Sequence, residues 1–235
     1  METIPVSMRV AHRGSPVPDP TRRAMIQPYL DHLPLIAILR GVSPGEVVAV
    51  GKALVDAGFV MIEVPLNSPD PLDSIRQLTE RFGETILIGA GTVTRVQQVA
   101  EIASAGGRLV VMPHGDGDVV RAAKDAGLVC IPGIATPTEA FAALSSGADA
   151  LKLFPAELLT PAVLRSMRAV LPSATRFLPV GGISPDGMAA YVAAGAAGFG
   201  LGSALYRRGD DAERVAANAR DFVAAWRRLR SVSSA

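Results

Sequence analysis

One lysine of this chain is placed for covalent chemistry. The sequence contains three lysines against twenty arginines, and Lys152 is the lysine that lies in an apolar run, 148–155, typical of a buried strand. Burial lowers the pKa of an ammonium, and the neutral amine is a nucleophile toward ketones, which a guanidinium is not. Lys152 is therefore predicted to form a Schiff base. The alternative is a snorkelling or ion-paired lysine at the end of a strand.

A glutamate interrupts a second apolar run. Glu63 stands in the segment 60–65, where a carboxylate is rare unless it is paired or does chemistry. Burial raises the pKa of a carboxyl group and suits it to general acid/base catalysis. If both side chains face one cavity, Glu63 would move protons for an iminium formed on Lys152. The alternative is a structural ion pair with Arg40 or Lys152.

Two glycine-rich turns predict a phosphate site. The segments 180–186 (Val-Gly-Gly-Ile-Ser-Pro-Asp) and 198–203 (Gly-Phe-Gly-Leu-Gly-Ser) each place small residues before the expected start of a helix. Backbone amides there can approach a phosphate closely, and the helix N-terminus favours its charge. The alternative is a pair of tight turns without a ligand.

Other polar residues follow expected strands. Arg40, after the apolar run 35–39, could bind a substrate carboxylate or phosphate through its forked guanidinium, or else pair with Glu63. His114 and Asp116 are more typical of a surface loop than of a catalytic pair. The single cysteine, Cys130, is expected in the core.

The elements that must position these residues repeat along the chain. From Leu33 onward, an apolar run, a small polar loop, an alanine-rich amphipathic stretch and a final glycine recur every 20 to 25 residues. The pattern predicts strands at 34–39, 59–64, 85–88, 108–112, 128–131, 149–153, 176–180 and 197–201. It predicts helices at 44–57, 69–81, 94–105, 116–126, 137–146, 160–170, 185–194, 203–207 and 211–230. The glycines that end the helices, Gly58, Gly83, Gly106, Gly127, Gly147 and Gly195, are expected in the left-handed conformation.

Eight strands alternating with helices imply parallel βαβ crossovers. The predicted fold class is α/β, a (β/α)8 TIM barrel over residues 28–235 with an extra C-terminal helix, because closure leaves no exposed sheet edge. An open doubly wound sheet is the alternative. Residues 1–27 form a polar, proline-containing extension that is not expected to fold.

In such barrels the active site lies where the carboxyl ends of the strands meet the loops that follow them. The unusual residues of this chain gather at those positions: Arg40, Glu63, Asn67, Thr92, Pro113, Lys152, Phe154, Val180, Gly181, Gly182, Gly202 and Ser203. This clustering favours the functional interpretation of Lys152 and Glu63. It also makes Pro113 and Phe154 candidates to line the substrate site.

Composition excludes several classes of function. A net charge of +1 gives no electrostatic case for binding nucleic acid or an anionic membrane. One cysteine cannot form an internal disulfide, and the three histidines have no metal-ligand spacing. The first 27 residues lack the apolar region of a secretory signal, and no run reaches the length of a membrane span. We therefore expect a soluble, cytoplasmic protein.

Five segments carry a resemblance to a known family. They are 33–41 (Leu-Pro-Leu-Ile-Ala-Ile-Leu-Arg-Gly), 62–69 (Ile-Glu-Val-Pro-Leu-Asn-Ser-Pro), 88–93 (Ile-Gly-Ala-Gly-Thr-Val), 151–155 (Leu-Lys-Leu-Phe-Pro) and 179–182 (Pro-Val-Gly-Gly). In this order they are similar to the 2-keto-3-deoxy-6-phosphogluconate and -phosphogalactonate aldolases, class I lyases on a (β/α)8 barrel. The resemblance implies that Lys152 is the Schiff-base lysine and Glu63 the general acid/base. It also implies that Arg40 and Thr92 hold the pyruvyl carboxylate, and that Gly182 and Ser203, with Gly181 and Gly202 beside them, bind phosphate.

The resemblance further implies a phosphorylated keto-deoxy sugar acid as the substrate. Members that act on the gluconate usually carry Leu-Arg-Thr after the second strand and a threonine before the glycine pair. This chain has Leu66-Asn67-Ser68 and Val180, the pattern of the enzymes acting on the galactonate, its C4 epimer. The resemblance implies a homotrimer. It also implies that the reaction needs neither a metal nor another cofactor, because the iminium withdraws the electrons.

Two features depart from the usual family pattern, the loop at His114-Gly115 and the N-terminal extension. Two other functions stay open at this point. A catalytically silent phosphate-binding barrel would need neither Lys152 nor Glu63. A phosphosugar isomerase or synthase on the same fold would keep the phosphate turns without a Schiff base.

Overall fold

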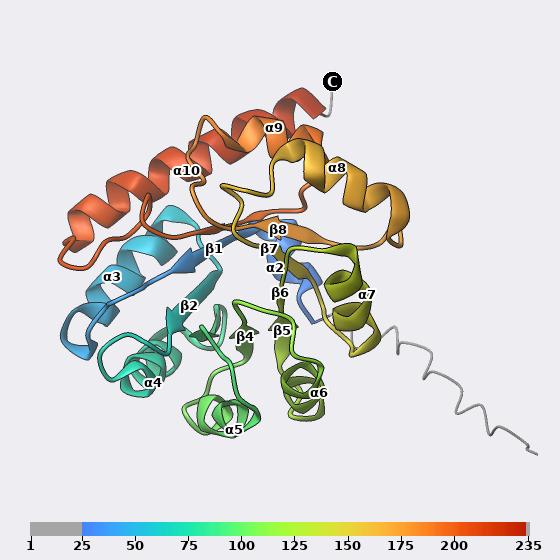
Figure 1. Cartoon of the computed structure of the whole chain (residues 1–235). Helices are drawn as coiled ribbons and strands as arrows, with labels where there is room; N and C mark the ends of the chain where they lie inside the picture. The colour runs from blue at the N-terminus through green and yellow to red at the C-terminus, as the bar shows by residue number, and fades with distance from the viewer. Residues whose placement is uncertain (1–24, 234–235) are drawn as a thin grey trace, which may run out of the picture.

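Short strands lie at the centre of the structure, and helices surround them (Figure 1). The computed structural model describes residues 25–233. Its strands are β1 (Leu35–Ile38), β2 (Met61–Pro65), β3 (Leu87–Gly91), β4 (Leu109–Val111), β5 (Val129–Ile131), β6 (Gly133–Ile134), β7 (Leu151–Leu153), β8 (Phe177–Pro179) and β9 (Phe199–Leu201). Its helices are α2 (Gln27–His32), α3 (Pro44–Ala57), α4 (Pro71–Phe82), α5 (Val96–Ser104), α6 (Gly117–Asp125), α7 (Pro137–Ser145), α8 (Pro161–Val170), α9 (Met188–Ala193) and α10 (Ala212–Ser233). In this part of the chain no helix is both long and apolar enough to cross a membrane.

All strand pairings are parallel, as the alternation of strands and helices predicts. One sheet has six strands in the order β5-β4-β3-β2-β1-β9, and the other has three in the order β6-β7-β8. Pro132 alone separates β5 from β6, and an isolated parallel bridge joins Val180, after β8, to Gly200 in β9. The two sheets therefore follow one another with short breaks, and the carboxyl ends of all strands point to the same side.

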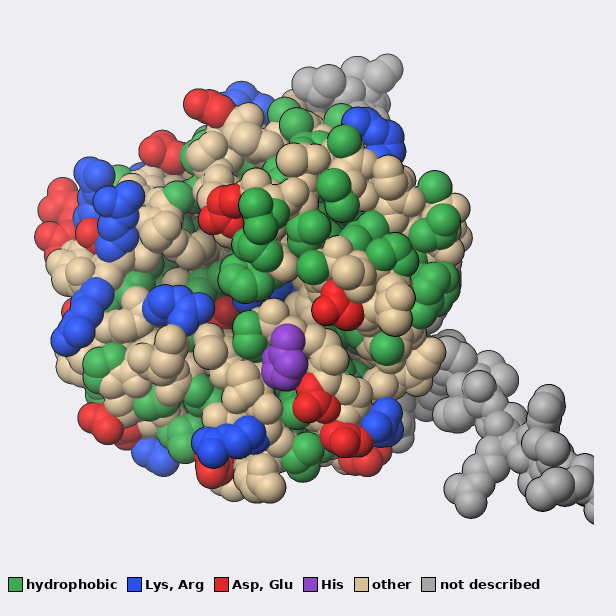
Figure 2. Space-filling view, in the orientation of Figure 1, with side chains coloured by type: hydrophobic (Ala, Val, Ile, Leu, Met, Phe, Trp, Pro, Cys, Tyr) green, Lys and Arg blue, Asp and Glu red, His purple; other side chains and the backbone are tan. Residues whose placement is uncertain are grey.

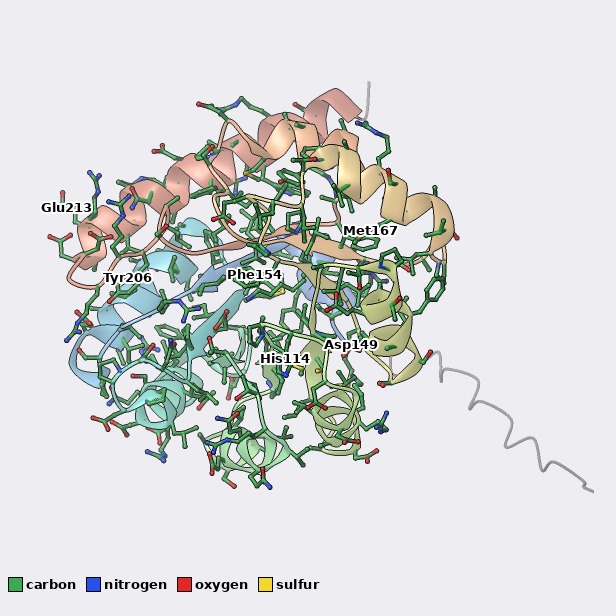
Figure 3. All side chains as sticks on the ribbon, viewed as in Figure 1. His114, Asp149, Phe154, Met167, Tyr206 and Glu213 are labelled. Atoms are coloured by element: carbon green, nitrogen blue, oxygen red, sulfur yellow. The ribbon has the colours of Figure 1, made fainter. Side chains whose placement is uncertain are left out.

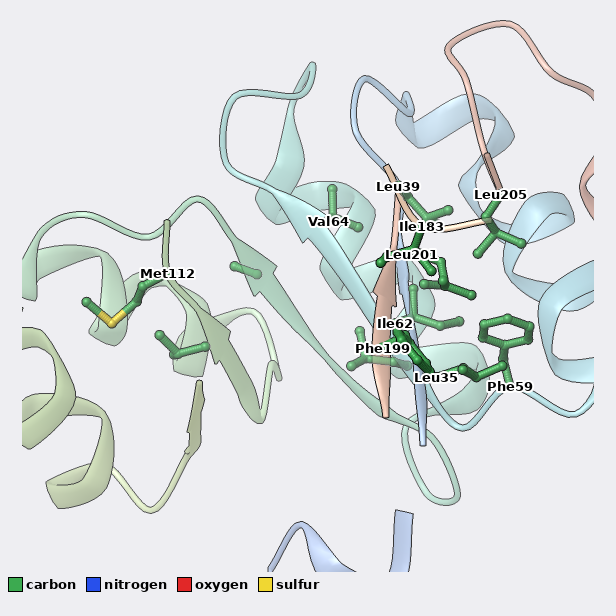
Figure 4. Packing of buried hydrophobic residues seen from close by; sticks show 14 of the residues in the cluster. Leu35, Leu39, Phe59, Ile62, Val64, Met112, Ile183, Phe199, Leu201 and Leu205 are labelled. Atoms are coloured by element: carbon green, nitrogen blue, oxygen red, sulfur yellow. The ribbon is translucent and has the colours of Figure 1, made fainter. Parts of the chain in front are cut away.

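Alternate residues of the strands enter two different hydrophobic clusters. In β1 and just after it, Leu35 and Leu39 join the larger cluster, and Figure 4 shows them with Ile62 and Phe199 of the neighbouring strands. Ile36 faces the other way, into a smaller cluster built mainly from the first residues of the strands. The larger cluster holds the helices against the sheets, and the smaller one fills the space inside.

Helix α2 closes the smaller cluster at the amino ends of the strands. Ile26 and Leu30 both belong to that cluster, and Ile26 is fully buried. The predicted extension, 1–27, therefore ends too late in the sequence, because Gln27 already begins α2. Residues 1–24 of it lie outside the described part of the chain. With this end filled, the opposite end of the strands is left to form a site.

The predicted helix at 203–207 is wrong, because this segment forms a turn. The N–H groups of Leu205 and Tyr206 both donate to Gly202 O, at 2.8 and 3.0 Å, but the chain then turns away. Gly209, with φ of 90°, and the Arg207–Asp210 backbone turn prevent further helical bonds. The other predicted strands and helices each overlap an observed one, although 185–194 shortens to α9.

Five of the six glycines predicted to end helices have the expected left-handed conformation. Gly58, Gly106, Gly127, Gly147 and Gly195 have positive φ. Gly83 keeps a right-handed φ of −64°, and its N–H continues the helical pattern by bonding to Thr79 O at 2.8 Å.

Candidate active site

The predicted site residues lie at the carboxyl ends of the strands. His114, which follows β4, and Phe154, which follows β7, both lie near the centre of one face (Figure 3). The space-filling view from the same side shows this face hollowed near its centre (Figure 2). The loops after β1, β2, β3, β7, β8 and β9 converge there and bring together residues that are far apart in the sequence.

Glu63 carries a buried carboxyl group, one oxygen of which has no hydrogen-bond partner among the described residues. It lies in β2 between Ile38 of β1 and Gly89 of β3, and 1% of its surface is exposed. In the described part of the chain it forms no ion pair, and Oε2 has no hydrogen-bond partner. Burial raises its pKa from 4.5 to about 7, although the positive charges of Lys152 and Arg40 oppose the shift. The carboxyl group therefore exists in both protonation states near neutral pH, as a proton carrier requires.

Gly91 of β3 makes room for this carboxyl group. A β-carbon at position 91 would overlap the carboxylate of Glu63. The position of the glutamate side chain thus requires glycine at this point of the strand.

Lys152 differs from the other two lysines in its surroundings. Lys124 is also buried, but it pairs with Asp149 at 2.6 Å, and Lys52 pairs with Asp56 on the surface of α3. Lys152, in the middle of β7 and 4% exposed, has no carboxylate within ion-pair distance in the described chain. The structural alternatives of an ion-paired or snorkelling lysine are therefore wrong.

The environment of Lys152 favours the neutral amine. Burial lowers the pKa of its ammonium; Glu63 opposes this shift and Arg40 adds to it. Its Nζ lies 4.7 Å from the centroid of the Phe154 ring, a contact that favours the ammonium form and so opposes part of the effect of burial. The opposite pKa shifts of Glu63 and Lys152 favour a protonated acid beside a neutral amine, which is the pair that imine formation needs.

Arg40 is held by two neighbouring loops. Its Nη1 donates to Asn67 Oδ1 at 2.7 Å, and both Nη atoms lie 3.4 Å from Thr92 Oγ1. Thr92 has φ of 57°, a left-handed conformation that costs free energy in a β-branched residue. The alternative in which Arg40 pairs with Glu63 is wrong. Its guanidinium is instead fixed at the rim, where it can meet an anion.

Asn67, which the sequence predicts to contact the substrate, also holds Arg40. Its amide oxygen is occupied by Arg40, so only Nδ2 remains for a substrate. Ser68 next to it is buried, and its Oγ accepts a hydrogen bond from Gly41 N at 2.9 Å. The loops after β1 and β2 are therefore tied together, and Asn67 orients Arg40 from one of them.

The first glycine-rich turn has a left-handed backbone that favours glycine. Gly181 and Gly182 have φ of 109° and 63°, and Val180 before them is 7% exposed. A β-carbon on Gly200 would lie 2.6 Å from Cγ2 of Val180, so β9 leaves space for this side chain. The side chain of Glu157 lies against the glycine pair, since a β-carbon on Gly182 would be 2.8 Å from Glu157 Cγ.

The second glycine-rich turn lies after β9, which neighbours both β1 and the end of β8. Gly202 is half-buried, and a β-carbon on it would meet nothing within 4 Å. Ser203 is exposed, and its backbone oxygen accepts a hydrogen bond from Arg207 Nε at 3.0 Å. Both turns thus border the same end of the site.

The remaining predicted positions lie at the rim. Pro113 and Phe154 are half-buried, and His114 is exposed. His114 O accepts a hydrogen bond from Gly133 N at 3.2 Å, which joins the loops after β4 and β5. Asp116 is a helix cap, as its Oδ1 accepts hydrogen bonds from Asp118 N at 2.8 Å and Val119 N at 3.3 Å.

A comparison with protein-family models identifies the lineage of this site. Residues 26–218 match the model described as "Aldolase: KDPG and KHG aldolase". The chain belongs to the KDPG and KHG aldolase family. Among its relatives is the 2-dehydro-3-deoxy-6-phosphogalactonate aldolase of Escherichia coli (strain K12), which is 47% identical over 195 residues, 83% of this chain and 95% of the relative.

Two further matches agree with membership of the KDPG and KHG aldolase family. The solved structure named "Native KDPGal structure" has a TM-score of 0.84 and 46% identity, and the match covers 85% of this chain and 97% of that one. The 2-dehydro-3-deoxy-phosphogluconate aldolase of Treponema pallidum (strain Nichols) is more distant, with 36% identity over 148 residues, 63% of this chain and 70% of the relative.

Several residues at the mouth of this aldolase were not singled out from the sequence: Glu157, Arg207 and Arg208. Nothing in the sequence marks Glu157, because its importance comes from its contact with the glycine pair of another unit. The arginine pair was assigned to a short helix and its end. In the described residues, no group of three or more His, Cys, Asp or Glu side chains is arranged to hold a metal ion.

Proposed function

We propose that the protein is a class I aldolase that cleaves 2-dehydro-3-deoxy-6-phospho-D-galactonate to pyruvate and D-glyceraldehyde 3-phosphate. One observation carries the proposal: the buried amine of Lys152, without a carboxylate partner, lies close enough to Glu63 for each to shift the pKa of the other. Membership of the KDPG and KHG aldolase family and the similarity to the galactonate-named relative support the same conclusion.

Carbon–nitrogen bond formation is the first half of the proposed mechanism. The neutral Nζ of Lys152 attacks the C2 ketone, and the resulting carbinolamine loses water with the proton supplied by Glu63. The product is a protonated iminium between Lys152 and C2. Glu63 is left as a carboxylate, beside a cation that stabilises it.

Carbon–carbon cleavage is the second half. The Glu63 carboxylate takes the proton of the C4 hydroxyl, directly or through one water, and the C3–C4 bond breaks. The bonding pair moves toward the iminium and forms an enamine, while C4 leaves as the aldehyde of glyceraldehyde 3-phosphate. A proton then returns to C3, and water hydrolyses the iminium to release pyruvate and free Lys152.

The other predicted residues hold the two anionic ends of the substrate in this proposal. Arg40, positioned by Asn67 and Thr92, binds the carboxylate at C1. The amides near Gly181, Gly182 and Gly202, with Ser203, bind the phosphate at the far end. Pro113 and Phe154 line the space between, and Phe154 packs beside the reacting amine. No metal or cofactor takes part.

The proposal extends to the whole molecule. We infer that the two sheets close into one (β/α)8 barrel across Pro132 and the Val180–Gly200 bridge, within a single domain that follows an N-terminal extension. We further infer a homotrimer that works in the cytoplasm on a small phosphorylated keto-deoxy sugar acid, with neither nucleic acid nor membrane as a partner. Sedimentation at several protein concentrations tests the trimer.

Val180 decides between the C4 epimers. A threonine here could bond a substrate hydroxyl that the buried valine cannot, and a hydroxyl without a partner costs about 10–150-fold in kcat/KM. The galactonate should therefore be the better substrate. The more distant relationship to the gluconate-named relative agrees with this assignment.

The test is an assay of both pure epimers with a coupled measurement of pyruvate. We expect kcat/KM to favour the galactonate, and Val180→Thr to narrow the gap. Val47→Thr, in α3, adds the same hydroxyl to a buried valine away from the mouth and should change both epimers equally. Equal rates on the two epimers, or a preference for the gluconate, would contradict the role of Val180.

A further inference from the structure

The loop after β9, residues 202–211, is firmly fastened to two helices. Tyr206 is 2% exposed, and its hydroxyl donates to Glu46 Oε1 in α3 at 3.3 Å. Asn218 of α10 donates through Nδ2 to Leu205 O at 3.1 Å. Figure 3 shows Tyr206 near α3, at one side of the mouth. Residues next to Tyr206 in this loop are therefore held at defined positions.

Two arginines follow this anchor, and each contacts a loop that carries a proposed binding residue. Arg207 donates through Nε to the backbone oxygen of Ser203 at 3.0 Å, so its guanidinium lies alongside the serine with both Nη groups unused by that bond. The stem of Arg208 lies over Gly41, because a β-carbon there would be 3.3 Å from Arg208 Cβ and 3.6 Å from its Cδ. Gly41 directly follows Arg40.

Neither of these arginines is neutralised by a carboxylate side chain. Within residues 25–233, the ion pairs of the structure involve Lys52, Arg76, Arg121 and Lys124 as the cations. Asp210 does approach Arg207, but its carboxylate accepts the backbone N–H, at 2.8 Å. The two guanidinium groups, both on exposed residues, are thus available to an external anion.

A phosphate bound at the glycine-rich turns needs a compensating positive charge. A phosphomonoester carries about −1.5 to −2 charges at neutral pH. The proposed donors there, the backbone amides of the glycine turns and the hydroxyl of Ser203, are neutral. The ionisable side chain that lies against Gly181 and Gly182 is the carboxylate of Glu157, which repels a phosphate. The loop after β9 can supply this positive charge, because β9 adjoins both β1 and the end of β8.

We propose that Arg207 and Arg208 are specificity-determining residues that bind the substrate phosphate and select phosphorylated over unphosphorylated keto-deoxy sugar acids. The inference rests on the proposed function. Arginine suits the task because its forked donors match two phosphate oxygens at once. Arg207 also positions Ser203 through its Nε, so it acts both on the phosphate and on the hydroxyl beside it.

The test compares 2-dehydro-3-deoxy-6-phosphogalactonate with its unphosphorylated form. Arg207→Gln and Arg208→Gln, singly and together, should lower kcat/KM for the phosphorylated substrate, chiefly through KM. The double variant should lose about 10–100-fold, the usual effect of a charge-assisted hydrogen bond. Its activity on the unphosphorylated substrate should stay within about 2-fold of wild type, because that substrate has no phosphate for the two guanidinium groups to bind.

Three controls separate this role from a structural one. Arg220→Gln removes an exposed arginine from α10 and should change neither substrate. Lysine at both positions should restore part of the phosphate preference, since the charge returns without the fork. Inorganic phosphate should inhibit the wild type competitively and the double glutamine variant more weakly.

Outcomes of the test are distinguishable. If the wild type cleaves the phosphorylated substrate but the double variant loses both substrates equally, or loses neither, the role of the arginines is wrong and the aldolase assignment stands. If the wild type cleaves neither substrate, the proposed function fails, and this inference fails with it.

Discussion

Replacing Glu63 by glutamine should slow catalysis. The stability of the variant relative to the wild type should also increase as the pH rises. The catalytic loss should be about 10²–10⁴-fold, the usual contribution of a positioned acid/base. The gain in stability follows from the buried position of the carboxyl group, which makes its ionised form unfavourable in the folded protein.

The magnitude comes from the two pKa values. In the folded protein the pKa of Glu63 is about 7, and 4.5 is its value in the absence of burial. Between these values the folded state binds more protons than the unfolded state, so the free energy of unfolding of the wild type falls as the pH rises. At 1.36 kcal/mol per pKa unit, the full effect is about 3 kcal/mol, of which about 2–3 kcal/mol falls between about pH 5 and about pH 8.

The variant should lack this slope, because glutamine is neutral in both states. Glu63→Gln also removes a negative charge near Lys152, which shifts the variant by an amount of its own. The prediction therefore concerns the change with pH and not the absolute difference. The free energy of unfolding of the variant minus that of the wild type should rise by about 2–3 kcal/mol from about pH 5 to about pH 8.

Urea unfolding at a fixed protein concentration measures this difference. Trp226, the single tryptophan, is 7% exposed in α10 and reports unfolding by fluorescence. Glu101→Gln, an exposed glutamate of α5, is the matched control and should follow the wild type at every pH. A difference that stays constant between the two pH values, or that falls, would refute a carboxyl group with a raised pKa at position 63.

Three other substitutions test the geometry of the site. Gly91→Ala should lower kcat by about 10–100-fold, because its β-carbon displaces the Glu63 carboxylate. Gly45→Ala, whose β-carbon meets nothing within 4 Å, should leave kcat unchanged. Equal kcat values for the two variants would contradict the packing of Glu63 on Gly91. Asn67→Ala removes the hydrogen-bond acceptor that lies 2.7 Å from Arg40 Nη1. The pyruvate concentration needed for half-maximal trapping by borohydride should rise about 10-fold. An unchanged concentration would show that Asn67 does not contribute to carboxylate binding. Glu157→Gln should lower KM for the phosphorylated substrate about 2–5-fold and not for the unphosphorylated one, and a raised KM would show that Glu157 helps to bind phosphate.

The sequence predicts much of the fold because each unit repeats local signals. Apolar runs, polar loops and terminal glycines come in the same order, and they locate the strands and most helices. The failures lie where the signals are short or where tertiary contacts decide. Helix α2 has only six residues and depends on burying Ile26 and Leu30 inside the sheets. Residues 203–207 could form a helix by composition, but the anchoring of Tyr206 to Glu46 and the turn at Gly209 prevent it.

In the site, too, some features are predictable from the local sequence and others depend on tertiary contacts. Lys152 and Glu63 are predictable because a charge inside an apolar strand is costly and therefore conspicuous. Their lack of an ion pair is not predictable, since it depends on which loops reach which side chains. The hydrogen bond between Arg40 and Asn67 joins residues from two different units, and the contact of Glu157 with the glycine pair depends on the path of a loop. Asn67 therefore orients Arg40, a role that its position in the sequence does not indicate.

Borohydride reduction in the presence of pyruvate tests the central claim most directly. The account predicts one covalent adduct per chain, on Lys152, and neither an adduct nor turnover in Lys152→Arg, because a guanidinium cannot form the iminium. Lys52, exposed and paired with Asp56, and Lys124, buried and paired with Asp149, serve as internal controls and should stay unmodified. An adduct on either of them, no adduct at all, or turnover that survives in the arginine variant would contradict the account.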